Sequence, residues 1–151
     1  MKTLVLGLGN PVLTDDGVGF AVVEEVRKRL PTADVTVSQA SVGGLSLLEL
    51  VVGYDRVVIV DAIRTAGGTP GEVHQLSPDE FRGSIRAAST HDVDLATALE
   101  LGRQLGMEIP DEMVILAIEA ADVESFGEEL TPSVAAAVPQ AVELVLEQLT
   151  G

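Results

Sequence analysis

The chain has 151 residues, of which 46% are hydrophobic, and this is enough for one compact domain with a complete core. We therefore expect a single domain over residues 1–151. Nine basic and 24 acidic residues give a net charge of −15, so neither nucleic acid nor an anionic membrane surface is an expected partner. The lack of cysteine excludes disulfides, thiolate metal sites and cysteine-protease chemistry.

The first residues, MKTLV, contain no basic leader and no small-residue cleavage site. No apolar run in the sequence is long enough to cross a bilayer. We therefore expect a soluble, cytoplasmic protein.

Strands and helices alternate along the chain. Apolar runs predict strands, apolar residues at helical spacing predict helices, and the polar–apolar alternation of residues 72–76 predicts a half-exposed edge strand. In chain order we predict a strand at 3–6, a helix at 16–30, a strand at 35–37, a helix at 45–52, strands at 57–60 and 72–76, a helix at 93–105, a strand at 113–118 and a helix at 132–149. Thr131 is the predicted N-cap of the last helix, and Pro132 lies in its first turn.

This alternation is typical of an α/β fold. We expect one mostly parallel, twisted sheet of about five strands with helices on both faces. The irregular stretches at residues 64–71, 77–90 and 119–130 are the candidates for loops that form a site or bind a partner.

Three polar residues stand out at the predicted strand ends and loops. Asp16 follows a turn rich in glycine at the mouth of the first helix, Asp61 ends the apolar strand 57–60, and His91 lies in a loop. Because the carboxyl ends of parallel strands gather along one edge of a sheet, these three side chains are able to meet there. Two carboxylates and one imidazole suit a borderline divalent metal such as nickel, zinc or iron.

Several familiar chemistries do not fit the sequence. Gly7 and Gly9 are followed by Asn-Pro-Val, so the dinucleotide-binding fingerprint lacks its third glycine. The sequence contains no Gly-Lys-Ser/Thr loop and no Gly-x-Ser-x-Gly elbow, and its two histidines are too far apart for a His-Glu-x-x-His zinc site.

Each candidate residue also has a simpler structural interpretation. Asp16 is able to act as a helix cap or first-turn acid, a role that Asp15 would fill equally well. His91 is able to cap the helix that follows it. We interpret His74, on the predicted edge strand, as a solvated side chain.

The sequence resembles the hydrogenase maturation endopeptidases, and the resemblance spans nearly the whole chain. The segments that carry it are LGLGNPVLTDDGVG at 6–19, VDA at 60–62, STH at 89–91 and LTP at 130–132. The resemblance implies a nickel-dependent protease that removes the C-terminal extension of the large subunit of nickel–iron (NiFe) hydrogenase. It also implies that Asp16, Asp61 and His91 contact the metal and carry catalysis.

The chain departs from the family pattern at two places. Many members have Glu where this chain has Asp16. Asp is shorter than Glu by one methylene, so its carboxylate reaches about 1.5 Å less far. Many also have Asp-Gly-Gly-Thr after the second strand, where this chain has QASV at 39–42.

Three ligands on separate loops form an open and weak metal site, so we expect the nickel to be carried by the substrate, which is the hydrogenase large-subunit precursor. A monomer is favoured, although the sequence does not determine the oligomeric state. Two alternatives stay open: a non-catalytic, metal-binding or chaperone-like partner of hydrogenase assembly, and an acid-dependent protease of the same fold without nickel sensing. The acidic run at 119–129 is either a solvated loop or part of the substrate surface.

Overall fold

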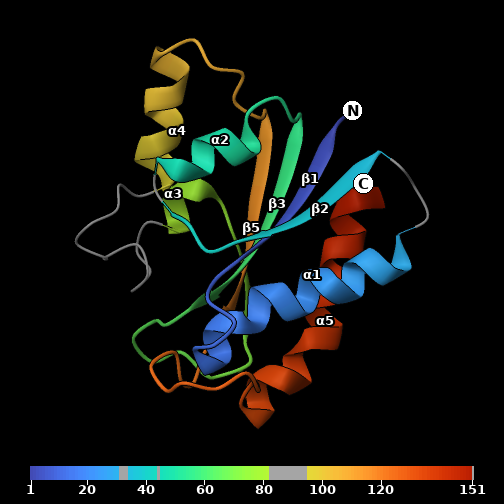
Figure 1. Cartoon of the computed structure of the whole chain (residues 1–151), viewed down its shortest axis with the longest axis vertical. Coiled ribbons are helices and arrows are strands. Elements are labelled where there is room, and N and C mark those ends of the chain that lie inside the picture. The colour runs from blue at the N-terminus through green and yellow to red at the C-terminus, as the bar shows by residue number, and fades with distance from the viewer. Residues whose placement is uncertain (31–33, 44, 82–94, 151) are drawn as a thin grey trace.

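The computed structural model describes residues 1–30, 34–43, 45–81 and 95–150 (Figure 1). These residues form one five-stranded sheet with helices on both of its faces. The elements are, in chain order, β1 (Thr3–Leu8), the 3-10 helix η1 (Thr14–Gly17), α1 (Val18–Arg29), β2 (Val35–Ala40), α2 (Ser46–Val51), β3 (Arg56–Ile63), β4 (Val73–Leu76), α3 (Pro78–Phe81), α4 (Leu95–Gln104), β5 (Glu112–Glu119) and α5 (Pro132–Thr150).

The strands lie in the order β2-β1-β3-β5-β4. The first four in this order are parallel, and only β4 runs antiparallel, at the edge beside β5. The central strands β1 and β3 are apolar over most of their length because each is covered on both faces. The predicted fold class and the predicted edge strand are therefore confirmed.

Two hydrophobic clusters fill the space between the sheet and its helices. The first joins one face of the sheet to α1 and α5, and includes Val22, Val60 and Val142. The second joins the opposite face to α2, α3 and α4, and includes Ile59 and Leu99. Figure 1 shows α1 and α5 on one side of the sheet and α2, α3 and α4 on the other.

Two element boundaries differ from prediction in a way that matters for the site. The helix predicted from residue 16 begins instead as η1, and α1 follows only from Val18. Asp61 does not end its strand, because β3 continues to Ile63. None of the helices in the described part of the chain is long and apolar enough to cross a membrane.

Candidate active site

The turn between β1 and η1 is folded tightly around the backbone of Asp16. Gly9 has a φ of +142°, a conformation that favours glycine, and a Cβ there would overlap the Asp16 carbonyl oxygen. The Asn10 N–H donates to this carbonyl oxygen (3.2 Å) and to Asp16 Oδ2 (3.1 Å). The glycine and the following amide therefore fix both the main chain and the carboxylate of Asp16.

A second close approach presses the start of α1 onto the sheet. A Cβ at Gly19 would collide with the carbonyl oxygens of Val60 and Leu8, and one at Gly7 would collide with the carbonyl oxygen of Gly19. Only glycine at positions 7 and 19 allows this packing. The contact brings η1, and with it Asp16, to the carboxyl ends of β1 and β3.

Asp61 reaches the same edge of the sheet from β3. In the register of the two strands Gly7 is opposite Val60, so Asp61 lies beside Leu8, the last residue of β1. The Ala62 N–H donates to Asp61 Oδ1 at 2.8 Å. Asp16 is 5% exposed and Asp61 1% exposed, which is unusual for carboxylates because burial of a charge is costly unless it is compensated.

The structure therefore brings two of the three predicted site residues to one edge. Asp16 lies in the first turn of η1, as the simpler interpretation allows, but it does not cap α1, whose N-cap is Gly17 and which no side chain caps. His91 lies outside the described residues. Within the described ranges, no three His, Cys, Asp or Glu side chains gather to hold a metal ion, so the complete ligand set stays a prediction.

The position of Asp15 was not foreseen. Its fully buried carboxylate accepts hydrogen bonds from the N–H groups of Ala121 (2.9 Å), Asp122 (2.9 Å) and Thr131 (2.8 Å). The Thr131 hydroxyl donates to Asp15 Oδ2 (2.8 Å) and Oδ1 (3.0 Å). Asp15 lies in the first turn of η1 as that interpretation allows, but its carboxylate caps no helix and instead anchors the loop between β5 and α5. Thr131 precedes α5 as predicted, but its hydroxyl serves this anchor.

A second buried carboxylate, Glu119, was also missed. It accepts hydrogen bonds from the Thr65 N–H (2.7 Å) and hydroxyl (2.6 Å), and its Oε1 lies 3.2 Å from His74 Nε2. The Glu119 side chain is 3% exposed and that of His74 is 29% exposed, so His74 is only partly solvated and contacts a buried carboxylate that the prediction did not include. A charged residue at the end of an apolar strand was the signal that singled out Asp61, and Glu119 carries the same signal.

The Glu119 carboxylate lies on the same face of the sheet as Asp61. Ile59 and Ile63 of β3 and Ala117 of β5 pack into the cluster with α2, α3 and α4. Because side chains alternate along a strand, Asp61 and Glu119 point to that face too. Ala117 is opposite Asp61 on one side and His74 on the other. The sheet edge is therefore polar across β3, β5 and β4.

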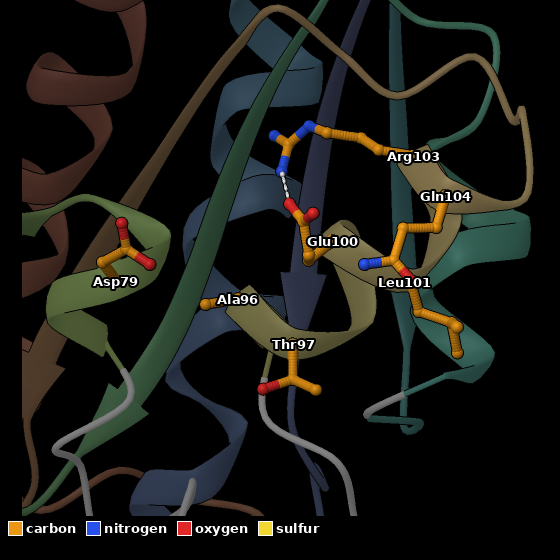
Figure 2. Close-up of a pocket in the computed structure, with 7 residues that line it drawn as sticks. All are labelled: Asp79, Ala96, Thr97, Glu100, Leu101, Arg103 and Gln104. Carbon is orange, nitrogen blue, oxygen red and sulfur yellow. Dashed lines mark ion pairs between the residues drawn. The ribbon is translucent and has the colours of Figure 1, made fainter.

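A pocket of about 540 Å³ lies elsewhere, between α3 and α4. Figure 2 shows its lining, which comes from α4 with one residue of α3, Asp79, and includes an ion pair between Glu100 and Arg103 (3.6 Å). Its described lining residues do not include Asp16 or Asp61. We assign this pocket no part in the site.

The sequence matches the family model of the hydrogenase maturation protease HycI over residues 20–148. The Hydrogenase 2 maturation protease of Escherichia coli strain K12 is 32% identical over 152 residues, which cover 99% of this chain and 91% of that protein. The hydrogenase expression/formation protein HupD of Rhizobium leguminosarum is 30% identical, over 98% of this chain and 74% of its own length.

Solved structures agree with these matches. The hydrogenase-maturating endopeptidase HybD of E. coli superposes with a TM-score of 0.85 at 32% identity, and the match covers 99% of this chain and 93% of HybD. The hydrogenase maturation protease HycI of Thermococcus kodakarensis gives a TM-score of 0.75 at 26% identity, over 99% and 93% of the two chains. The expected resemblance is thus confirmed over the whole fold, and the chain belongs to the hydrogenase maturation protease family.

Proposed function

We propose that this protein is an endopeptidase that removes the C-terminal extension of a NiFe hydrogenase large-subunit precursor after nickel has been inserted. Family membership supports the reaction class. The observation that carries the proposal is the pair of buried carboxylates, Asp16 and Asp61, at the carboxyl ends of β1 and β3. This sheet edge is where parallel α/β folds place their sites.

In this proposal Asp16, Asp61 and His91 together contact the metal and carry catalysis. The described residues that flank the His91 segment, Phe81 and Leu95, belong to the core cluster that also contains Leu8 and Ala117. Leu8 and Ala117 are the strand neighbours of Asp61. His91 lies in the segment between α3 and α4, outside the described residues, so its part in the site stays a proposal.

The ligand set suggests where the nickel comes from. Two carboxylates and one imidazole, without a thiolate, make an incomplete shell for a borderline metal ion. A protein with such a shell is suited to recognise a nickel ion that its substrate already holds. Recognition of that kind lets cleavage begin only when the metal has been inserted.

The main chain around the two carboxylates prepares them for this role. The Asn10 N–H donates to Asp16 and the Ala62 N–H donates to Asp61, so main-chain donors already orient both carboxylates. Either carboxylate is a suitable acceptor for a proton from the attacking water. A nickel ion held by the substrate and contacted by Asp16, Asp61 and His91 would supply Lewis-acid polarisation of the scissile carbonyl.

The test is to incubate the purified protein with nickel-loaded and nickel-free precursor and to measure the intact mass of the precursor. We expect loss of the C-terminal tail from the nickel-loaded form alone. A precursor that is bound and left intact in both forms would show a non-catalytic assembly partner. Removal of the tail from both forms would show a protease without nickel sensing. Asp61→Asn should prevent removal of the tail. Its matched control is Asp111→Asn, at an exposed aspartate 50 positions later in the sequence, which should process the precursor normally.

A further inference from the structure

The loop between β5 and α5, residues 120–131, presents an aromatic side chain to solvent. Phe126 is 88% exposed, and Val12 beside it is also exposed. The two are neighbours because the Gly127 N–H donates to the Val12 carbonyl oxygen at 2.8 Å. A large apolar side chain in full contact with water is unfavourable, and neighbouring exposed apolar side chains that form a patch often mark binding sites.

The exposure of Phe126 does not come from a loosely held loop. The Thr14 N–H donates to the Gly127 carbonyl oxygen (2.9 Å), and the Thr14 hydroxyl donates to that of Ser125 (2.6 Å). Asp122 Oδ1 accepts the N–H groups of Glu124 and Ser125, each at 2.9 Å. These bonds fix the main chain on both sides of Phe126. Because the main chain around Phe126 is already ordered, it loses little conformational entropy on binding, and this favours affinity.

The loop is continuous with the candidate active site. Asp15, the anchor of the loop, is the direct neighbour of Asp16, and Leu13 forms a β-bridge with Gly127. A macromolecule that covers Phe126 and Val12 therefore also covers the turn that carries Asp16.

Acidic side chains surround this apolar patch. Glu124, Glu128 and Glu129 are all exposed on the same loop. We propose that Phe126 and Val12, with this acidic rim, are the docking surface for the folded body of the protein substrate, whose matching surface is an apolar pocket bordered by Lys and Arg. This inference rests on the proposed function, because it takes the hydrogenase precursor as that substrate.

Charge decides between the occupants that such a patch could accept. A second copy of this chain would bring two acidic rims together in a protein whose net charge is −15, and an anionic membrane would be repelled as well. A basic protein surface is attracted instead, and the acidic rim would steer it onto the patch. The position of the patch beside the site then makes that surface part of the substrate.

The first test measures contact without requiring turnover. A photoreactive phenylalanine analogue is placed at position 126 and, as a control, at Leu105, which is exposed on the turn after α4. We expect a crosslink to the nickel-loaded precursor from position 126 and none from position 105. A precursor that crosslinks from neither position, or equally from both, would overturn the docking surface.

The second test measures initial rates over a range of precursor concentrations. Phe126→Ser should raise KM about 30-fold, as expected for loss of an aromatic anchor, with kcat nearly unchanged. Leu105→Ser should leave both constants as in the wild type. Glu128→Lys combined with Glu129→Lys should raise KM relative to the wild type, by a larger factor at low salt than at high salt. An unchanged KM for Phe126→Ser would also overturn the proposal.

The two tests separate this inference from the proposed function. A crosslink at position 126 without tail removal by the wild type would keep the docking surface and refute the protease activity. Tail removal by the wild type without a crosslink or a change in KM would keep the activity and refute the surface.

Discussion

The buried carboxylate of Asp15 receives both the N–H and the hydroxyl of Thr131, a residue 116 positions later in the chain. One aspartate therefore ties the turn beside Asp16 to the start of α5. Because Asp15 and Asp16 are adjacent, the position of one carboxylate depends on the bonds of the other.

Asp15→Asn should lower the free energy of unfolding by about 2–3 kcal/mol, since a carboxamide presents N–H donors to a site in which donors already converge. Thr131→Val should lower it by about 1 kcal/mol, because the Thr131 N–H bond remains. Urea denaturation measures both values. Thr36→Val, at an exposed position of β2, is the control and should change stability by less than about 0.5 kcal/mol.

A double-mutant cycle tests whether these effects come from one interaction. The double variant should lose less free energy of unfolding than the sum of the losses in the two single variants, because Asp15 and Thr131 are in direct contact. Additive losses would show that Asp15 and Thr131 act independently.

Asp16→Asn, Asp61→Asn and His91→Ala should each retain the fold and reduce tail removal by a factor of about 100 or more. Asn10 and Ala62 are able to donate to an asparagine oxygen as they do to the carboxylate, so the two isosteric changes remove charge and little else. Precursor processing followed by mass measures the activity, and circular dichroism checks the fold. Normal processing by any two of the three variants would refute the site assignment.

His74→Ala should process the precursor within about twofold of the wild type and lose at most about 1 kcal/mol of stability, since it makes one partly exposed contact with Glu119. Glu119→Ala should lose about 2–3 kcal/mol, because it removes the acceptor of two Thr65 hydrogen bonds and leaves a cavity where a side chain that is 3% exposed was packed. Urea denaturation measures both, with exposed Glu108→Ala as the control. Loss of activity in a folded His74→Ala would show that His74 belongs to the site.

The pKa of Asp122 is lowered from its ordinary value of 3.8, chiefly by the backbone N–H groups of Ser125 and then Glu124, with a smaller contribution from Arg64. A lowered pKa in the folded state means that the charged form stabilises the loop. This stabilisation is present above the ordinary pKa and is lost as the pH falls through the lower, folded-state value. Carbon-detected NMR of the Asp122 carboxyl should therefore show a midpoint below 3.8. A midpoint at or above that value would contradict the hydrogen bonds described for this loop.

The sequence was sufficient for the features that depend on local patterns. An aspartate after an apolar run singled out Asp61, and the glycine-rich turn singled out Asp16; both side chains are buried at one edge of the sheet, although β3 continues beyond Asp61. Asp15 could not be interpreted in the same way, because its partners lie 106 to 116 residues away and no local pattern specifies them. Glu119 carried a local signal, but its partners, Thr65 and His74, come from segments that only the sheet order brings together.

The last prediction concerns the source of the nickel. If the site recognises nickel held by the precursor, the purified protein should bind metal only weakly, because its three ligands make an incomplete shell. Processing of the nickel-loaded precursor should then persist after the protein has been treated with chelator and desalted.

A resident metal would give the opposite pattern. Chelator treatment of the protein alone would abolish cleavage, and metal returned to the protein would restore cleavage even of nickel-free precursor. Asp61→Asn separates the two cases further, because it should prevent processing although the wild type itself binds metal only weakly in calorimetry. The opposite result is that the wild type binds metal tightly and Asp61→Asn abolishes that binding. This result would identify an ordinary metal-activated hydrolase in which the proposed ligands hold a resident metal.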